Sequence, residues 1–270
     1  MVGKSLTITE LEMLEALKRS GYMLESEAAQ KLVDWGFFVQ TGQVVEDPIT
    51  GKGREIDIIA NSFGNNNSHS DVRILTQIEY VFEVKNNLYP IVLLTEFRDS
   101  PYIESWTGLK ERHTKPKDVK YHDYHEAYFE RLIEKNKNIY TQYCSFHKKR
   151  GKDDLMASHP ERFHESISKI ILHCDDIIDE RDNDDAETTF FRHFIYMPIL
   201  LVRGELYELH ENKLVEVTSS TLVTNYYHNS ERKMAFVFVV TRDGFQEFMR
   251  QTQEMERDVA MEMADRVRNP

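Results

Sequence analysis

Three charged side chains have types and spacing that could do chemistry together. Asp57 stands between isoleucines in the run REIDIIA (54–60), and Glu83 and Lys85 end the alternating run QIEYVFEVK (77–85). Side chains alternate across a strand, so Glu83 and Lys85 are expected on one face, about 6–7 Å apart. A carboxylate flanked by isoleucines needs a partner, because burying it unpaired costs several kcal/mol. Two such carboxylates repel unless a metal cation or a lysine holds them, so the pattern fits either a divalent metal ion beside an ammonium group or an ordinary ion pair between strands.

A fourth candidate lies on a preceding helix, expected over 23–35. The apolar stripe of this helix has four members at helical spacing: Ala28, Ala29, Leu32 and Val33. Glu25 lies on the same stripe, three residues before Ala28, whereas Glu27 lies on the polar side. We therefore favour Glu25 as the inward acid and keep Glu27 as the alternative.

The elements that position these groups are predicted from periodicity and turn residues. Helices are expected over 9–19, 23–35, 124–147 and 160–179 and after Asp243, and strands over 37–45, 54–60, 77–85, 91–94, 194–202, 206–209 and 234–241. Residues 61–71 are expected to form a polar loop, and 203–205 to turn the strand 194–202 into a hairpin with 206–209. Together the elements predict one α/β domain over 1–270 with a mixed sheet and an insertion at about 88–123.

Composition limits the classes of protein that fit. The chain has 270 residues, and 34 Lys and Arg against 46 Asp and Glu give a formal net charge of −12. An apolar content of 40% is enough for a core and argues against a disordered chain. The longest apolar run, 194–202, is shorter than the ~20 residues that span a bilayer, and two cysteines give no disulfide framework. We expect a cytoplasmic globular protein, with any contact to nucleic acid confined to a local site because the whole chain is acidic.

The helix, hairpin and strand together resemble the PD-(D/E)XK nuclease superfamily. The resemblance rests on a helix with an inward Glu, on Asp57 in GREIDIIA, and on the strand end Glu83-Val84-Lys85. Ile56 stands where the name of the superfamily has Pro. Because the motif is short, its order, spacing and strand context carry the identification.

The resemblance implies the restriction-endonuclease-like fold. It covers about residues 24–85 and implies an α-β-β-β-α-β core, completed by the helix near 124–147 and the strand 194–202. The mixed central sheet would be flanked by helices and followed by a C-terminal strand and helix. The segments 141–146 and 157–159 also look like a pattern seen in bacterial members of the superfamily.

The resemblance also implies a mechanism, metal-assisted hydrolysis of phosphodiesters. Asp57, Glu83 and the Val84 carbonyl would hold Mg²⁺ or Mn²⁺, which keeps several waters. Lys85 would orient or deprotonate a water and offset negative charge in the transition state. Glu25 would bind a metal-bound water or a second ion.

The expected partners follow from the same resemblance. Nucleic acid is the expected partner, DNA ahead of RNA, with no membrane, and a bacterial defence or restriction system is the expected setting. An acidic nuclease without its own recognition domain would use a homo-oligomer or an operon-encoded protein partner for targeting. The alternative is a non-cleaving module of the same fold that binds nucleic acid or serves as an assembly subunit.

Other motifs give weaker signals. His122 and His125 have metal-ligand spacing but no second ligand pair beside them, so a solvated pair is the simpler interpretation. The basic run 148–152, with Lys52 and Arg54 near the proposed site, offers candidate contacts to phosphates.

Overall fold

A computed structural model describes residues 8–46, 51–66, 73–96, 110–114, 138–148, 154–159, 161–182 and 190–268. The described helices are α1 (Glu10–Ser20), α2 (Tyr22–Asp34), α4 (Glu161–Asp182) and α5 (Phe245–Arg268). The first seven strands are β1 (Phe38–Glu46), β2 (Gly53–Asn66), β3 (Arg73–Lys85), β4 (Ile91–Glu96), β5 (Lys110–Thr114), β6 (Ile139–Lys148) and β7 (Leu155–Ser158). The remaining strands are β8 (Phe190–Val202), β9 (Leu206–His210), β10 (Lys213–Val217), β11 (Ser219–His228) and β12 (Glu231–Thr241).

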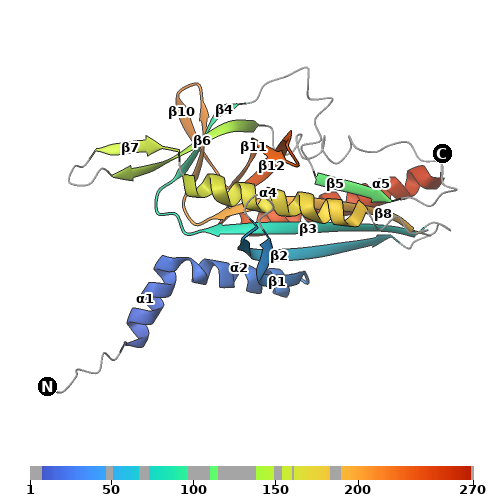
Figure 1. The fold of residues 1–270 in the computed structure, drawn as a ribbon, viewed down its shortest axis with the longest axis horizontal. Helices are drawn as coiled ribbons and strands as arrows, with labels where there is room; N and C mark the ends of the chain where they lie inside the picture. The colour runs from blue at the N-terminus through green and yellow to red at the C-terminus, as the bar shows by residue number, and fades with distance from the viewer. Residues whose placement is uncertain are drawn as a thin grey trace.

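The protein is α/β, with one large mixed sheet flanked by helices (Figure 1). The strand order is β1-β2-β3-β8-β12-β11-β6-β4-β9-β10, with β5 paired to β8 and β7 paired to β6. Strands β1, β2 and β3 are antiparallel neighbours, whereas β8 runs parallel to both β3 and β12. The C-terminal strand and helix expected from the sequence are β12 and α5.

Each face of the sheet buries its own hydrophobic cluster. Figure 1 shows α4 on one side of β3 and α2 on the other. The cluster beneath α2 and α5 includes Ala28, Leu32, Ile58, Tyr80, Phe82, Ile199, Phe245 and Phe248. The cluster beneath α4 includes Ile56, Ile59, Val81, Ile167, Ile170, Ile171, Cys174, Leu200 and Val237. Strand β8 contributes to both clusters, as its continuous apolar sequence predicts for a strand covered on both faces.

Helix α1 contributes nothing to either cluster. It begins with a capping box, in which the Thr9 hydroxyl accepts from the Glu12 N–H and the Glu12 carboxylate accepts from the Thr9 N–H. None of its residues is buried, and Figure 1 shows it projecting from the sheet. Capping hydrogen bonds, and not burial, therefore support this helix.

Three expectations about the elements are wrong. The helix expected over 124–147 is contradicted by strand β6, which pairs with β4 and β11; its part at 124–137 lies outside the described residues. The expected loop 61–71 is shorter, because β2 continues to Asn66 and β3 begins at Arg73. The expected hairpin through 203–205 does not form, because β9 pairs with β4 and β10 and not with β8. In each case tertiary strand pairing overrides the local pattern.

Two features bear on the environment of the chain. Within the described parts of the chain, no helix is both long and apolar enough to cross a bilayer. Cys174 is buried and Cys144 is partly exposed, and neither is in a disulfide.

Truncation of Val237 tests the placement of the cluster beneath α4. Val237 is fully buried, whereas Val44 on the edge strand β1 is 69% exposed. We expect Val237→Ala to lower the free energy of unfolding by about 2 kcal/mol, from lost burial plus an unfilled cavity. The matched variant Val44→Ala should change it by less than about 0.5 kcal/mol. Urea unfolding measures both, and equal effects would contradict this core.

Candidate functional site at the end of β3

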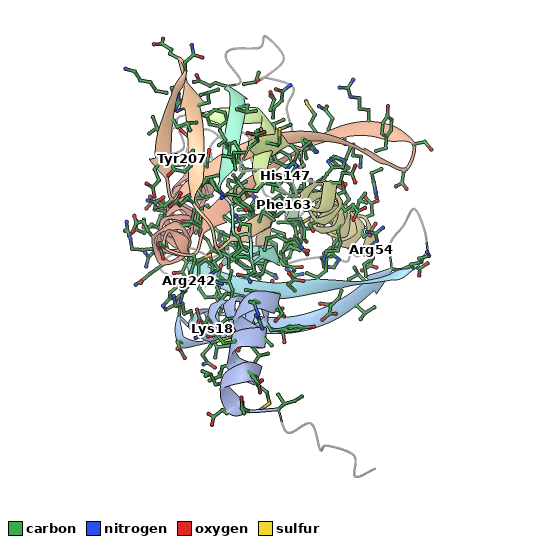
Figure 2. All side chains as sticks on the ribbon, turned by 90° about the vertical axis from the view of Figure 1, so that its left-hand side faces the viewer. Lys18, Arg54, His147, Phe163, Tyr207 and Arg242 are labelled. Carbon is green, nitrogen blue, oxygen red and sulfur yellow. The ribbon has the colours of Figure 1, made fainter. Side chains whose placement is uncertain are left out.

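The predicted residues lie at the end of the sheet where β3 finishes. Figure 2 looks onto this end, with Phe163 at the start of α4 above the strands and Lys18 at the end of α1 below them. Glu83, Val84 and Lys85 are the last residues of β3. Both helices therefore begin or end beside the carboxyl end of a central strand.

Asp57 joins the ends of two strands through its side chain. Pairing of β2 with β3 begins at Ile58 and Phe82, one residue beyond Asp57. The Asp57 Oδ2 atom accepts a hydrogen bond from the Val84 N–H at 2.7 Å. Strand alternation predicts a common face for Ile56 and Ile58, but this is wrong, because Ile56 packs in the cluster beneath α4 and Ile58 in the opposite cluster. The hydrogen bond from Val84 holds the Asp57 carboxylate at the end of β3.

Glu83 is the most enclosed carboxylate of the site. It is 4% exposed and forms ion pairs with Lys85 and with Lys169 of α4. Ser166, also on α4, donates a hydrogen bond to Glu83 Oε1 at 2.9 Å. Lys169 also donates to the Glu55 carbonyl oxygen at 2.6 Å. Helix α4 thus supplies a cation and a hydroxyl that hold Glu83 in place.

Glu25 and Glu27 diverge in the structure. Glu25, in the first turn of α2, is partly buried, and its pKa is raised by burial and then by repulsion from Asp57, Glu55 and Glu83. Glu27 instead pairs with Arg242 at 2.8 Å on the exposed side. Glu25 is therefore the acid of α2 that lies in the electrostatic field of the site.

The pKa of Asp57 is also raised. Burial is the main cause and repulsion from Glu83 is the next, while the Val84 N–H, Lys169 and Lys85 act in the opposite direction. Neighbouring carboxylates contribute to both raised pKa values, so Glu25, Asp57 and Glu83 lie close enough to repel one another.

The chain that follows Lys85 is anchored by hydrogen bonds. The Asn86 side chain donates to the carbonyl oxygens of Lys18 and Arg19, both at 2.8 Å, and so caps the end of α1. The Arg203 N–H donates to the Lys85 carbonyl at 3.0 Å. These bonds fix the end of β3 against α1 and the end of β8.

The donor types suit Mg²⁺, with one condition. Among the described residues, no three His, Cys, Asp or Glu side chains form a group that could hold a metal ion. Mg²⁺ does not need such a cage, because it commonly takes one or two carboxylates and keeps several waters. Asp57 and Glu83 supply that number, and their repulsion would be offset by a divalent cation. Binding at Glu83 would require Lys85 or Lys169 to move aside.

Lys169 and Ser166 are the residues of the site that the sequence analysis missed. Ser166 lies on the apolar stripe of α4, one residue before the buried Ile167, and it is itself 7% exposed. A polar residue on a buried helical stripe signals a buried partner. That signal was present in the sequence, although nothing in it identified Glu83 as the partner.

Two weaker motifs stay largely outside the structure. His122 and His125 lie outside the described residues, as do positions 149–152 of the basic run. Arg54 is described at the start of β2, where Figure 2 shows it beside α4.

The chain was compared with models of protein families, with curated proteins and with solved structures. None of these three comparisons found a match.

Proposed function

We propose that this protein is a Mg²⁺-dependent or Mn²⁺-dependent nuclease that hydrolyses phosphodiester bonds, with DNA as its substrate. The observation that carries the proposal is the grouping of Glu25, Asp57, Glu83 and Lys85 at one end of the sheet. The choice of DNA, and of a bacterial defence or restriction setting, rests on analogy with the resembled superfamily.

The order of the elements supports the proposal. Helix α2 is followed by three antiparallel strands, β1 to β3, and, after the intervening strands β4 to β7, by α4 and by β8, which lies parallel to β3. With β4 to β7 taken as an insertion, this order supports the α-β-β-β-α-β core that the resemblance implies. Helix α4 takes the place in that core that the sequence analysis assigned to residues 124–147.

Each residue of the site has a role in this proposal. Asp57 and Glu83, with the Val84 carbonyl, would hold the ion. A bound Mg²⁺ would lower the pKa of a coordinated water and offset charge on the phosphate. Lys85 would orient that water and offset negative charge in the transition state, and Glu25 would hold a second water by hydrogen bonding.

A non-cleaving module is the second candidate, and one observation favours it. Glu83 already contacts Lys85, Lys169 and Ser166, so its charge is compensated without a metal. In such a module the same groups would serve as a structural ion-pair network.

A cleavage assay separates the two candidates. Supercoiled plasmid, single-stranded DNA and RNA are each incubated with the protein in Mg²⁺, in Mn²⁺ and in EDTA. We expect metal-dependent cleavage, and a loss of about 10²-fold in Lys85→Ala, the scale of a lost general acid or base. The control Lys31→Ala changes an exposed lysine on α2 and should leave the rate unchanged.

The outcomes are distinct. Equal cleavage by wild type and Lys85→Ala would contradict the proposed site. Absence of cleavage of all three substrates, with metal-independent binding to nucleic acid, would support the module.

A further inference from the structure

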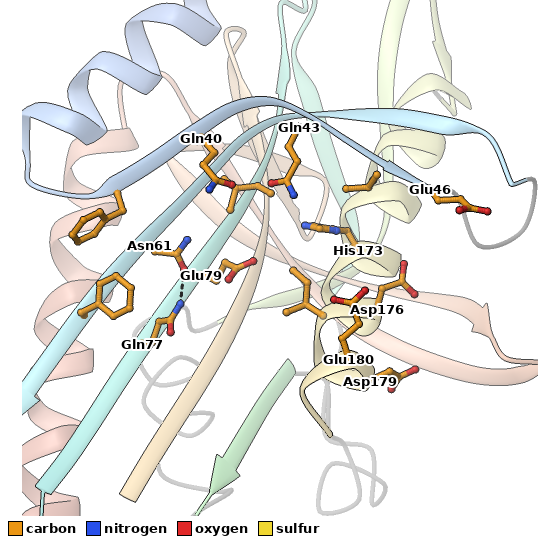
Figure 3. A pocket seen from close by; sticks show the side chains of 15 residues that line it. Gln40, Gln43, Glu46, Asn61, Gln77, Glu79, His173, Asp176, Asp179 and Glu180 are labelled. Carbon is orange, nitrogen blue, oxygen red and sulfur yellow. Dashed lines mark hydrogen bonds between the residues drawn. The ribbon is translucent and has the colours of Figure 1, made fainter. Parts of the chain in front are cut away.

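A groove of about 900 Å³ with a mixed polar and apolar lining lies between the sheet and the second half of α4. Its lining comes from β1, β2, β3 and α4 (Figure 3). The groove continues from the proposed active site along the same elements. Glu79 precedes Glu83 by four residues on the same face of β3, and His173 follows Lys169 by one turn of α4. Its volume is that of a small-molecule site.

The carboxylates of the groove lining are not balanced by a lysine or arginine in that lining. The described lining of the groove includes no lysine or arginine. It includes five carboxylates, those of Glu46, Glu79, Asp176, Asp179 and Glu180. Burial raises the pKa of Asp176, and its acidic neighbours Asp175, Asp179 and Glu180 raise it further, against the opposite effect of His228. Such a lining repels phosphate and attracts cations. The groove is therefore not a path for the backbone of a nucleic acid.

His173 provides a second, independent indication of a ligand. The residue is 7% exposed, and its Nε2 atom has no hydrogen-bond partner in the described part of the chain. Figure 3 shows the imidazole directed from α4 toward the strands that line the groove. A buried polar atom without a partner costs about 1–3 kcal/mol. Burial lowers the pKa of His173 to about 4, so the ring is neutral near pH 7 and Nε2 can accept a hydrogen bond.

Three of the carboxylates lie on neighbouring turns of α4, and the other two lie on β3 and at the end of β1. No three of the described His, Cys, Asp or Glu side chains form a group that could hold a metal ion. A ligand with several separated positive charges fits this spacing better than one metal ion does. Near the groove's β1–β2 side, Phe38 and Phe63 form an exposed edge-to-face pair with ring centroids 5.4 Å apart, and aromatic faces attract ammonium groups.

We propose that the groove binds a small linear organic polycation, a polyamine-type molecule with ammonium groups separated by short aliphatic chains. Its ammonium groups pair with Glu46, Asp176 and Glu180, and one of its N–H groups donates to His173 Nε2. Its aliphatic chain lies against Ile59 and Ile177. This site does not depend on the proposed nuclease activity.

Calorimetric titration of spermidine into metal-free protein tests the proposal. We expect one site per chain in the wild type, and about tenfold weaker binding in the triple variant Glu46→Gln, Asp176→Asn, Glu180→Gln, since each exposed ion pair contributes a few tenths to 1 kcal/mol. His173→Phe should also weaken binding about tenfold, from the loss of a hydrogen bond to a charged group. His173→Gln keeps an acceptor and should restore part of the affinity.

Two controls make the result decisive. The triple variant Glu216→Gln, Glu231→Gln, Asp258→Asn removes three exposed carboxylates outside the groove lining and should bind spermidine as the wild type does. Asp57→Asn, which disables the proposed nuclease site, should also bind normally, so the two proposals can fail separately. Equal loss in both triple variants, or unchanged binding in the groove triple and in His173→Phe, would overturn the polycation site. His173→Phe keeps an aromatic ring and is expected to fold.

Discussion

Asp57→Asn is expected to reduce cleavage by about 10³-fold or more without destabilising the fold at neutral pH. Asparagine keeps an oxygen that can accept the Val84 N–H, so the link between β2 and β3 can persist. The charge that would bind the metal is lost, and metal stabilisation of the transition state is worth several kcal/mol, about 4 kcal/mol for a 10³-fold effect.

The expectation that Asp57→Asn does not destabilise the fold follows from the raised pKa of Asp57. A carboxyl whose pKa is higher in the folded state binds more protons there, so the free energy of unfolding falls as the pH rises from its ordinary pKa through the raised one. Above that window the ionised Asp57 destabilises the fold, and the neutral asparagine removes this effect. A cleavage assay measures the loss of activity in Asp57→Asn, and urea unfolding measures its stability, both near pH 7.

Glu27→Gln is the matched control for Asp57→Asn. It also removes one carboxylate, but Glu27 pairs with Arg242 on the exposed side. We expect wild-type cleavage and a change in unfolding free energy within about 0.5 kcal/mol. A large loss of stability in Asp57→Asn with little loss of activity would assign Asp57 a structural role.

Lys169→Met is expected to lower the free energy of unfolding by about 3–5 kcal/mol, the cost of breaking a buried ion pair from one side. The Lys169 and Glu83 side chains are 12% and 5% exposed, so the loss leaves an enclosed carboxylate with less compensation. Lys85→Met should cost less, because Lys85 is 26% exposed and its removal leaves Lys169 in place. Urea unfolding in metal-free buffer measures both variants.

A double-mutant cycle tests the reason for this loss. Adding Glu83→Gln to Lys169→Met should recover part of the lost stability, because the uncompensated charge is then gone. Lys18→Met, which changes a lysine that is 52% exposed and pairs with Glu15 at 3.7 Å, is the control with little expected effect. Strict additivity of the Glu83 and Lys169 substitutions would contradict the pairing.

Alternation along β3 was enough to indicate that Glu83 and Lys85 lie together, whereas along β2 it fails, because Ile56 and Ile58 pack in opposite clusters. Glu83 and Lys85 are two residues apart on a strand with clear alternation, and they form an ion pair. Position on the helical stripe also distinguished Glu25 from Glu27. Lys169 could not be assigned in this way, because its contact with Glu83 depends on how α4 packs on the sheet.

The errors in the predicted fold share one physical cause. Strand β6 has the sequence IYTQYCSFHK, which is rich in aromatic and β-branched residues, yet the sequence analysis includes most of it in a helix expected over 124–147. Likewise β9 follows β8 after a short turn but pairs with β4, more than 100 residues earlier in the chain. Such pairings are set by long-range contacts, which a local pattern does not contain.

Titration of Mn²⁺ into the metal-free protein tests for the metal site without any knowledge of the substrate. We expect one bound Mn²⁺ per chain near pH 7 and weaker binding at about pH 5, because carboxylates with raised pKa values must lose their protons before they bind a metal. Asp57→Asn should lose this binding, and Glu27→Gln should keep it. Failure of the wild type to bind Mn²⁺, or equal binding by wild type and Asp57→Asn, would contradict a metal site at the end of β3.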